Sequence, residues 1–360
     1  MALLARSRST PAIRRRRAVA GVVVVIAAAG LVACSTTTPN SPRPAATITV
    51  MTRNMYFGAD LSPLFAAAAG QLGPDATAAY RQLIQSDVPA RLKADAQEIA
   101  SAKPGLVALQ EAVIWTVTPA GQTTATVAYD FVVGLQADLA RLGSPYAVAA
   151  VADGFSGALP VPAVGVVGLQ DRDVILVRSH DPQLSVSNPT SGTYAHDLTV
   201  HVAGAPIAIK RGWGAVDATV GRHHFRVVAT HLEAYSDPTR DAQAHELLDL
   251  VRGGREPTLV LGDVNSPATG AGSQAYDAVR AAGWSDAWAQ ANPGGAGMTC
   301  CRTANLSSGP LTQRIDMIFT DGAFRAERAW LVGAGASDRT PGGLWPSDHA
   351  GVVATLAVAT

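Results

Sequence analysis

The stretch Leu259-Val260-Leu261-Gly262-Asp263-Val264-Asn265 joins an apolar run to two polar side chains. A short continuous apolar run is typical of a β-strand that is buried on both faces. Asp263 and Asn265 follow the run directly, so a buried strand would carry them to the rim of its sheet. The stretch therefore predicts a sheet-based fold with polar groups at one edge.

The same arrangement recurs in four other segments, which are centred on Glu111, His231, Asp316 and Asp348-His349. Each polar residue ends an apolar run, lies inside one, or stands just before one. Carboxylates are costly to bury unless they are paired or bound to a metal ion. A hard cation with oxygen ligands, such as Mg²⁺, is the simplest partner for them. The clustered Cys and His residues are too few for a zinc site.

Hydrophobic periodicity predicts the remaining elements and one domain after the first 46 residues. Strands are expected at 47–50, 106–109, 126–133, 146–151, 174–177, 198–202, 225–230, 258–261, 315–320 and 352–357, and helices at 75–85, 87–102, 135–142, 239–251 and 273–282. This mixture suits sheets that are covered by helices on their outer faces. The apolar stretch 155–169 is expected to be a hairpin or a surface loop that packs on the core, with contact to a membrane as the alternative.

The N-terminal segment is expected to be an export signal. Residues 1–33 hold six arginines and an apolar run that is too short for an ordinary membrane span. The run ends in Leu31-Val32-Ala33-Cys34, which resembles a bacterial lipobox and predicts lipidation of Cys34. A plain signal peptide is the alternative, and Sec and twin-arginine export stay open. Residues 34–46, rich in Ser, Thr and Pro, are expected to form an unstructured tether, so that 47–360 form the folded domain outside the cytoplasm, anchored to the membrane or secreted.

The charge balance argues against a protein that coats DNA without regard to sequence. The whole chain carries 28 basic and 28 acidic residues, but without the six arginines of the first 33 residues only 22 basic residues remain. Sequence-independent DNA binding depends mainly on neutralising phosphates, which a mildly acidic protein does poorly. The adjacent Cys300 and Cys301 lack the spacing of a zinc site, and either a disulfide or two free thiols fits their sequence.

Taken together and in this order, the polar segments resemble the endonuclease/exonuclease/phosphatase superfamily. The resemblance runs from Asn54 to His349; Arg53-Asn54 stands where the family usually has Trp-Asn, and Gly262-Asp263-Val264-Asn265 where it usually has Gly-Asp-Phe-Asn. It implies an α/β fold of the α/β/β/α type, a four-layer sandwich of two mixed β-sheets with helices outside. It also implies metal-dependent cleavage of a phosphoester at the rim of the sheets.

The resemblance assigns the metal and the attacking water to particular residues. Glu111 would be the principal Mg²⁺ ligand, with Mn²⁺ as a substitute, Asn54 close by, and Asp348 a further ligand directly or through water. His349, oriented by Asp316, would activate the attacking water or stabilise the transition state. Histidine suits this task because its pKa lies near the working pH.

Four further positions would act on the phosphate or the nucleophile. Asp263 and Asn265 would position the nucleophile and the phosphate, and His231 would contact the phosphate or assist the leaving oxygen. Arg172 would neutralise a phosphate oxygen, unless it forms a surface ion pair with one of its flanking acids.

The sequence does not choose the phosphoester. Nucleic acid, phospholipid and small phosphodiesters or phosphomonoesters stay open as substrates, because substrate choice in this superfamily resides in the loops between the motifs. The alternative to an enzyme is a surface lipoprotein that keeps the fold for binding. No partner protein is implied.

Overall fold

A computed structural model of the chain describes residues 46–65, 67–254 and 256–358, and its framework is two mixed β-sheets. The expected signal peptide, Cys34 and all but the last residue of the expected tether lie outside the described residues. Among the described residues, no helix is both long enough and apolar enough to cross a membrane.

The first sheet has eight strands in the order β15-β16-β1-β2-β6-β3-β4, with β5 paired to β6 beside this path. Its strands are β1 (Thr47–Asn54), β2 (Leu106–Gln110), β3 (Ile114–Pro119), β4 (Thr126–Asp130), β5 (Tyr146–Val161), β6 (Gly165–Arg178), β15 (Phe324–Val332) and β16 (Gly351–Val358). Only β1 and β2 pair in parallel in this sheet, so the two strands end at the same edge.

The second sheet has six strands in the order β13-β14-β12-β11-β10-β7. Its strands are β7 (Leu184–Thr193), β10 (Gly212–Val220), β11 (His223–His231), β12 (Thr258–Asp263), β13 (Ser285–Asp286) and β14 (Asp316–Thr320). Here β11 and β12 form the parallel pair. A separate two-stranded hairpin is formed by β8 (Leu198–Val202) and β9 (Ala205–Ile209).

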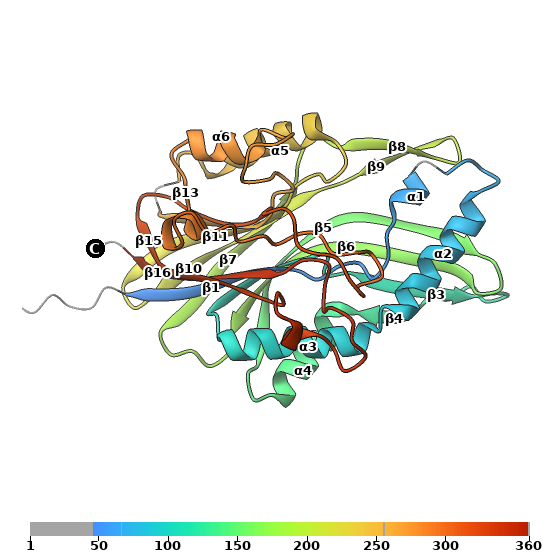
Figure 1. Ribbon diagram of the computed structural model, residues 1–360, viewed down its shortest axis with the longest axis horizontal. Coiled ribbons are helices and arrows are strands. Elements are labelled where there is room, and N and C mark those ends of the chain that lie inside the picture. The colour runs from blue at the N-terminus through green and yellow to red at the C-terminus, as the bar shows by residue number, and fades with distance from the viewer. Residues whose placement is uncertain (1–45, 66, 255, 359–360) are drawn as a thin grey trace, which may run out of the picture. The chain divides into compact units, whose positions relative to one another are not determined.

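Helices cover the outer faces of both sheets (Figure 1). Helices α2 (Leu72–Gln85), α3 (Val88–Ala102) and α4 (Phe131–Arg141) pack on the first sheet, and α5 (Asp237–Val251) and α6 (Ala275–Ala281) pack on the second. Shorter helices are α1 (Ser62–Phe65), α7 (Ala287–Ala291) and the 3₁₀ turn Ala336–Asp338. The predicted four-layer α/β/β/α sandwich is confirmed.

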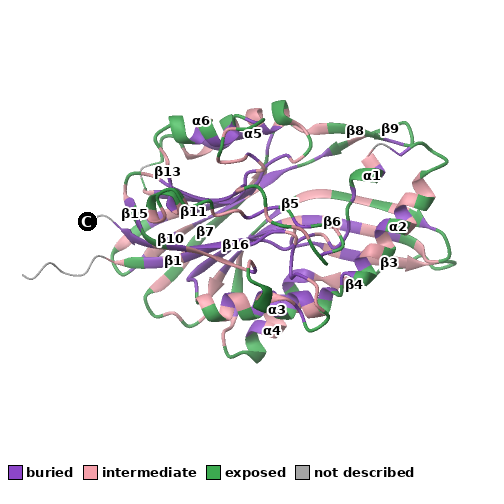
Figure 2. Cartoon of the chain, in the orientation of Figure 1, coloured by how far each residue is buried: buried purple, intermediate pink, exposed green. Residues whose placement is uncertain are grey.

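Three apolar clusters correspond to the three interfaces between these layers. The middle cluster joins the two sheets through residues such as Val50 and Leu106 of the first and Val227 and Leu261 of the second. The outer clusters join each sheet to its helices. Figure 2 shows the central strands of both sheets largely in the colour of buried residues. This double burial explains why β2 and β12 are continuous apolar runs rather than alternating ones.

Local signals explain where helices α3 and α4 begin. Pro89 lies in the first turn of α3, where its missing N–H is tolerated, and the Asp87 side chain accepts a hydrogen bond from Ala90 N. The prediction that a strand spans 126–133 is wrong for its last three residues, because β4 ends at Asp130 and α4 begins at Phe131. The Asp130 side chain caps α4 by accepting hydrogen bonds from Val132 N and Val133 N. An Asp in this position starts a helix more readily than it continues a strand.

For the stretch 155–169 the sequence predicts either a hairpin or a surface loop, and the stretch forms a hairpin. β5 and β6 continue into it and pair in register from Ser156↔Gln170 to Val161↔Gly165. Both strands are therefore much longer than the expected runs at 146–151 and 174–177.

Arg53 ties helix α3 to the interior of the first sheet. Its side chain is fully buried, and Nε and Nη2 donate to Asp95 Oδ1 at 3.1 and 2.9 Å. Nη1 donates to the backbone oxygen of His349 at 2.6 Å, and Glu98 completes the ion pair. One guanidinium therefore connects a helix, a strand and the segment before β16.

We expect Arg53→Met to lower the free energy of unfolding by about 3–5 kcal/mol, because it leaves the Asp95 carboxylate buried without a counter-charge. Urea denaturation followed by circular dichroism measures this loss. The double variant Arg53→Met/Asp95→Leu should recover part of it, since it removes one of the two buried carboxylates that pair with Arg53. A loss below 1 kcal/mol for the single variant would show that Arg53 does not stabilise the fold in this way.

Candidate active site

The carboxyl ends of the two parallel strand pairs meet at one rim. Asn54, the last residue of β1, donates from Nδ2 to Glu111 Oε1 and to Asp263 Oδ2, both at 3.1 Å. Glu111 follows β2, and Asp263 ends β12, so this single amide connects the two sheets. Glu111 also accepts a hydrogen bond from Phe57 N at 2.7 Å. The predicted neighbours Asn54, Glu111 and Asp263 are therefore brought together.

The residues that follow the strands turn sharply into this rim. Glu111 and Asn265 have φ angles of 54° and 50°, in the left-handed region that residues with a Cβ rarely adopt. Asn265 N donates to Asp263 Oδ1 at 2.9 Å, and Asn265 Nδ2 donates to Leu232 O at 2.9 Å. Such backbone strain is often found at functional sites.

His349 is paired with Asp316 beside the same rim. His349 Nδ1 donates to Asp316 Oδ2 at 2.9 Å, and Asp263 Oδ2 lies 3.8 Å from the same nitrogen. Asp263 and Asp316 face each other in the register of β12 and β14. The predicted orientation of His349 by Asp316 is thus present in the geometry, and it fixes the proton on Nδ1 and leaves Nε2 as the free ring nitrogen.

Buried hydrogen bonds hold the Ser347-Asp348-His349 segment in place. Ser347 Oγ donates to Asn54 O at 2.8 Å and accepts from His349 N at 3.1 Å. Arg91, also buried, donates from Nε to Pro346 O at 2.7 Å and from Nη2 to Tyr56 O at 2.8 Å. The Asp348 carboxylate lies next to His349, with 4.0 Å between Oδ1 and Nε2.

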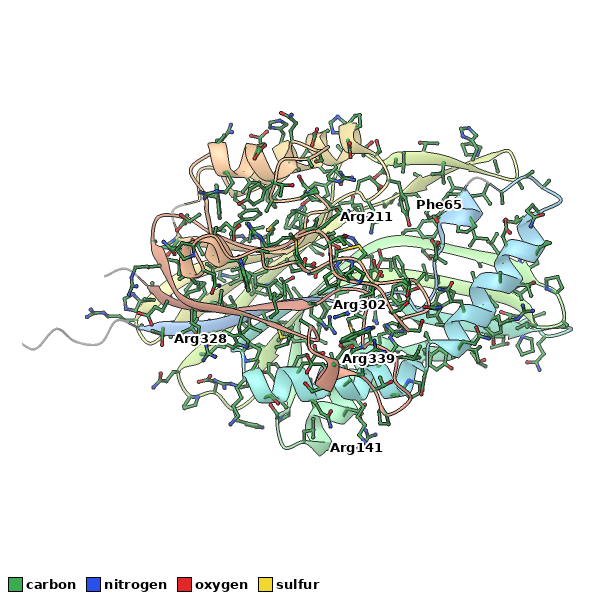
Figure 3. All side chains as sticks on the ribbon, in the orientation of Figure 1. Phe65, Arg141, Arg211, Arg302, Arg328 and Arg339 are labelled. Carbon is green, nitrogen blue, oxygen red and sulfur yellow. A yellow bond between two sulfur atoms is a disulfide. The ribbon has the colours of Figure 1, made fainter. Side chains whose placement is uncertain are left out.

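His231 lies opposite His349 and is held by an arginine that the sequence reasoning missed. Arg211 Nη1 lies 3.1 Å from His231 Nδ1 and donates to it. His231 Nδ1 is therefore the acceptor, and the ring proton is on Nε2, 3.7 Å from Asp263 Oδ2. Arg211 is buried and forms ion pairs with Asp171 at 3.4 Å and Glu233 at 3.6 Å (Figure 3).

Arg172 is not among the residues that the structure brings together here. On β6, Asp171 and Asp173 are buried on one face, and Arg172 between them points to the other. Its Nε donates to Ala112 O and its Nη2 to Asp130 Oδ1, both at 2.8 Å. Arg172 does form an ion pair, but its partner is the cap of α4 and neither of its flanking acids. Alternation along a strand could have indicated that these acids and Arg172 lie on opposite faces.

Burial raises the pKa values of the carboxyls at the rim. Desolvation raises the pKa of Glu111 to about 8, with the charges of Asp348 and Asp171 adding to the effect. Desolvation and the charge of Asp316 raise the pKa of Asp263 to about 6. Desolvation also raises the pKa of Asp171 to about 6, although Arg211 opposes this. Burial thus disfavours the ionised form of each of these carboxyls.

The two histidines respond to this environment in opposite directions. Burial alone would lower the pKa of His349, but the carboxylates of Asp316, Asp348 and Asp263 raise it well above its ordinary value. Burial and the neighbouring Arg211 cation lower the pKa of His231 well below its ordinary value. His231 is therefore neutral, whereas His349 holds its proton as long as the carboxylate charges stay uncompensated.

The donor set fits a divalent cation. Asp263, Asp316 and His349 offer ligand atoms that lie within 4.8 Å of one another. Within the described part of the chain, the buried Oδ1 atoms of Asp171, Asp173 and Asp316 have no hydrogen-bond partner. Unpartnered buried carboxylate oxygens call for a positive charge. Glu111 and Asp348 stay the ligands predicted from the family resemblance. Asn54, also predicted near the metal, donates its amide to Glu111 and Asp263.

Cys300 and Cys301 are joined in a disulfide next to the candidate site. Their sulfur atoms lie within 4.8 Å of a ring nitrogen of His349. A disulfide offers no thiolate, so this group is not a metal site in the oxidised form. Of the two alternatives left open by the sequence, the structure has the disulfide.

A four-layer α/β sandwich with a carboxylate–histidine cluster at the rim of its two sheets defines the class of protein. The family model described as the endonuclease/exonuclease/phosphatase family matches residues 82–349, well over half of the chain. The chain belongs to this family. Its members are phosphoesterases that generally depend on divalent metal ions and act on phosphoesters such as nucleic acids, so the chain belongs to a family of hydrolases.

Solved structures with the same fold are similar at low sequence identity. An endonuclease/exonuclease/phosphatase from Bacteroides vulgatus has a TM-score of 0.53 and 16% identity, covering 87% of this chain and 99% of that chain. An endonuclease/exonuclease/phosphatase from Beutenbergia cavernae has a TM-score of 0.55 and 22% sequence identity, and the match covers 87% of this chain and 72% of that chain. A mannosyl-6-phosphatase from Bacteroides thetaiotaomicron has a TM-score of 0.50 and 16% sequence identity, and the match covers 86% of this chain and 99% of that chain. A comparison with curated proteins finds no match.

We expect the metal-free domain to lose stability as the pH rises from about 4.3, the unfolded pKa of a glutamate, to about 8, the folded pKa of Glu111. The folded pKa of Glu111, about 8, lies above its unfolded value of about 4.3, so the folded state binds the extra proton. The stabilisation from this proton is complete below the unfolded pKa and is lost as the pH rises through the folded pKa. Thermal unfolding at several pH values in EDTA measures the loss.

Glu111→Gln supplies the control, because glutamine keeps the shape and cannot ionise. The variant should lose less Tm than the wild type over this pH interval. Equal losses in the two proteins would show that Glu111 does not carry the pH dependence.

Proposed function

We propose that the chain is a Mg²⁺-dependent phosphoester hydrolase in which water attacks the phosphorus directly. The observation that carries the proposal is the 2.9 Å hydrogen bond between His349 and Asp316 beside Asp263, at the rim where Asn54 bridges Asp263 to Glu111. A bound Mg²⁺ or Mn²⁺ on Glu111 and Asp348 would polarise a phosphoryl oxygen and offset the charge of the cluster.

His349 is proposed to accept the proton of the attacking water at Nε2. Asp316 keeps the other proton on Nδ1 and orients the ring. The carboxylates raise the pKa of His349, and a protonated ring cannot act as a base. Compensation of the charges on Glu111 and Asp348 would lower that pKa toward the working range, which supports a role for the cation in setting the state of this base.

His231 and Asp263 are proposed to act on the phosphate side. Neutral His231 presents its Nε2–H because Arg211 occupies Nδ1, so His231 can donate to a phosphoryl or leaving oxygen. Asp263, held by Asn54 and Asn265 N, is proposed to orient the attacking water. Fixed donors of this kind stabilise developing charge without reorganising. The Oδ1 atom of Asn265 is proposed to accept a hydrogen bond from the attacking water, because Nδ2 donates to Leu232 O.

Purified domain should hydrolyse bis-p-nitrophenyl phosphate in the presence of Mg²⁺ and stop in EDTA. We expect His349→Ala and Glu111→Ala to lower kcat by about 10²–10⁴-fold, since each removes a group that acts on the reacting atoms. His224→Ala is the matched control, because His224 is exposed and bonds only to Thr219. Full activity after chelation, or in the His349→Ala variant, would defeat the proposal.

We further propose that the enzyme is exported and held at the membrane through a lipid on Cys34. The supporting observation is the sequence Leu31-Val32-Ala33-Cys34 after a basic and apolar segment. Cys34→Ser in the expressed full-length chain should move the protein from the membrane fraction to the soluble extracytoplasmic fraction. Unchanged fractionation of the variant, measured by immunoblot, would exclude the lipid anchor.

A further inference from the structure

An apolar cavity of about 100 Å³ lies between α1, α2, the far end of the β5–β6 hairpin and the β8–β9 hairpin. Its walls include Leu64, Ala79, Trp115, Leu159 and Ile207, and the lining side chains are aliphatic or aromatic. Among them, polar atoms occur only on Tyr80 and Trp115. An engineered apolar cavity of about 150 Å³ binds benzene, so this volume suits a ring or a short hydrocarbon segment.

The cavity is open to solvent at its edges, and a backbone hydrogen bond fixes the position of the β8–β9 hairpin at its wall. Phe65, Tyr80, Phe155 and Ile207 are only partly buried, so a ligand can reach the interior. Ala203 N, at the tip of the β8–β9 hairpin, donates to Ala67 O at 3.1 Å and fastens the hairpin over the α1–α2 connection. Figure 1 shows α1 between this hairpin and the β5–β6 hairpin.

Two short links join the cavity to the candidate active site. Trp115 Nε1 donates to Phe57 O at 2.9 Å, and Phe57 N donates to Glu111 Oε2 at 2.7 Å. On the other side, the Phe65 ring packs edge-on against Tyr235 with 5.2 Å between centroids. Tyr235 N in turn donates to Glu233 Oε1, and Glu233 pairs with Arg211. Figure 3 labels Phe65 on α1 and Arg211 nearer the middle of the sheets.

We propose that this cavity binds the hydrocarbon part of the substrate, so that the enzyme acts on phosphoesters of lipids and other amphiphiles. The inference rests on the proposed function and names its substrate class. Apolar walls next to a charged phosphate site match a molecule with a phosphate at one end and a hydrocarbon at the other. A nucleobase fits less well, because its polar edges would lose their hydrogen bonds to water among these side chains.

The test is a series of p-nitrophenyl phosphodiesters whose second group is methyl, butyl, hexyl or octyl. The leaving group and the scissile bond stay the same, and concentrations stay below the critical micelle concentration. We expect kcat/KM to rise by about fourfold for each methylene group buried, until the chain fills the cavity. Hydrolysis of the methyl ester without any dependence on chain length would overturn the inference and leave the proposed hydrolase standing.

Ala79→Leu fills the cavity from α2 and should bring the octyl-to-methyl ratio of kcat/KM close to one. Ala78→Leu is the matched control: it is the same substitution on the exposed face of the same helix and should keep the wild-type ratio. Ala76→Leu, at another buried lining position of α2, serves if the Ala79 variant does not fold. A wild-type ratio in both filling variants would contradict the assignment of the cavity.

Binding provides a readout that does not depend on catalysis. Hexylphosphonate should bind more tightly than methylphosphonate in calorimetry, with a negative heat-capacity change, and Ala79→Leu should remove this preference. That result would support the cavity even if no ester were hydrolysed, whereas equal affinities would overturn it. Thymidine 5′-(p-nitrophenyl phosphate) is the competing arm: faster hydrolysis than the octyl ester, abolished by Ala79→Leu, would assign the cavity to a nucleobase instead.

Discussion

The rest of the site depends on one constraint, which is that each sheet has a parallel strand pair ending at the common rim. Parallel pairing of β1 with β2 places Asn54 next to Glu111, and parallel pairing of β11 with β12 places His231 beside Asp263. Face-to-face packing of the sheets then closes the distance between the two pairs, and the amide of Asn54 spans it. Carboxylates from distant parts of the chain are thereby collected in a region of low dielectric, where they repel one another.

Buried arginines offset part of the electrostatic repulsion between these acids, and they also position the reactive groups. Arg53 neutralises Asp95 and donates to the backbone oxygen of His349. Arg91 donates to the backbone oxygens of Tyr56, which follows β1, and of Pro346, which precedes β16. Arg211 pairs with Asp171 and Glu233 and fixes the tautomer of His231. Burial raises the pKa of Glu111 to about 8, and the nearby Asp348 and Asp171 charges add to this effect. The buried carboxylate oxygens that keep no hydrogen-bond partner, Oδ1 of Asp171, Asp173 and Asp316, are the physical basis for proposing a divalent cation at this rim.

The apolar cavity shows how a shared framework can serve a particular substrate. Its walls come from the far end of the β5–β6 hairpin, the β8–β9 hairpin and the short helix α1, which lie outside the motifs that carry the polar cluster. The polar cluster determines the chemistry, and the surrounding connections determine which molecule can present its phosphate there. Trp115, which lines the cavity, is joined to Glu111 by two hydrogen bonds through Phe57, and this link supports the proposal that one ligand occupies both.

The sequence by itself indicated sheets covered by helices and a polar rim, because continuous apolar runs identify buried strands and the residues that end them lie at a rim. The four-layer arrangement and the roles of the polar residues came from the resemblance to the family. Thus Glu111, Asp263, Asp316, His231 and His349 were predicted, and the structure brings them together. Only the tertiary structure decided the role of Arg211, the ion-pair partner of Arg172 and the cavity beside Trp115. Which charged residues pair with one another, and which hairpins close over a pocket, depend on contacts between segments far apart in the chain. Local patterns do not encode those contacts.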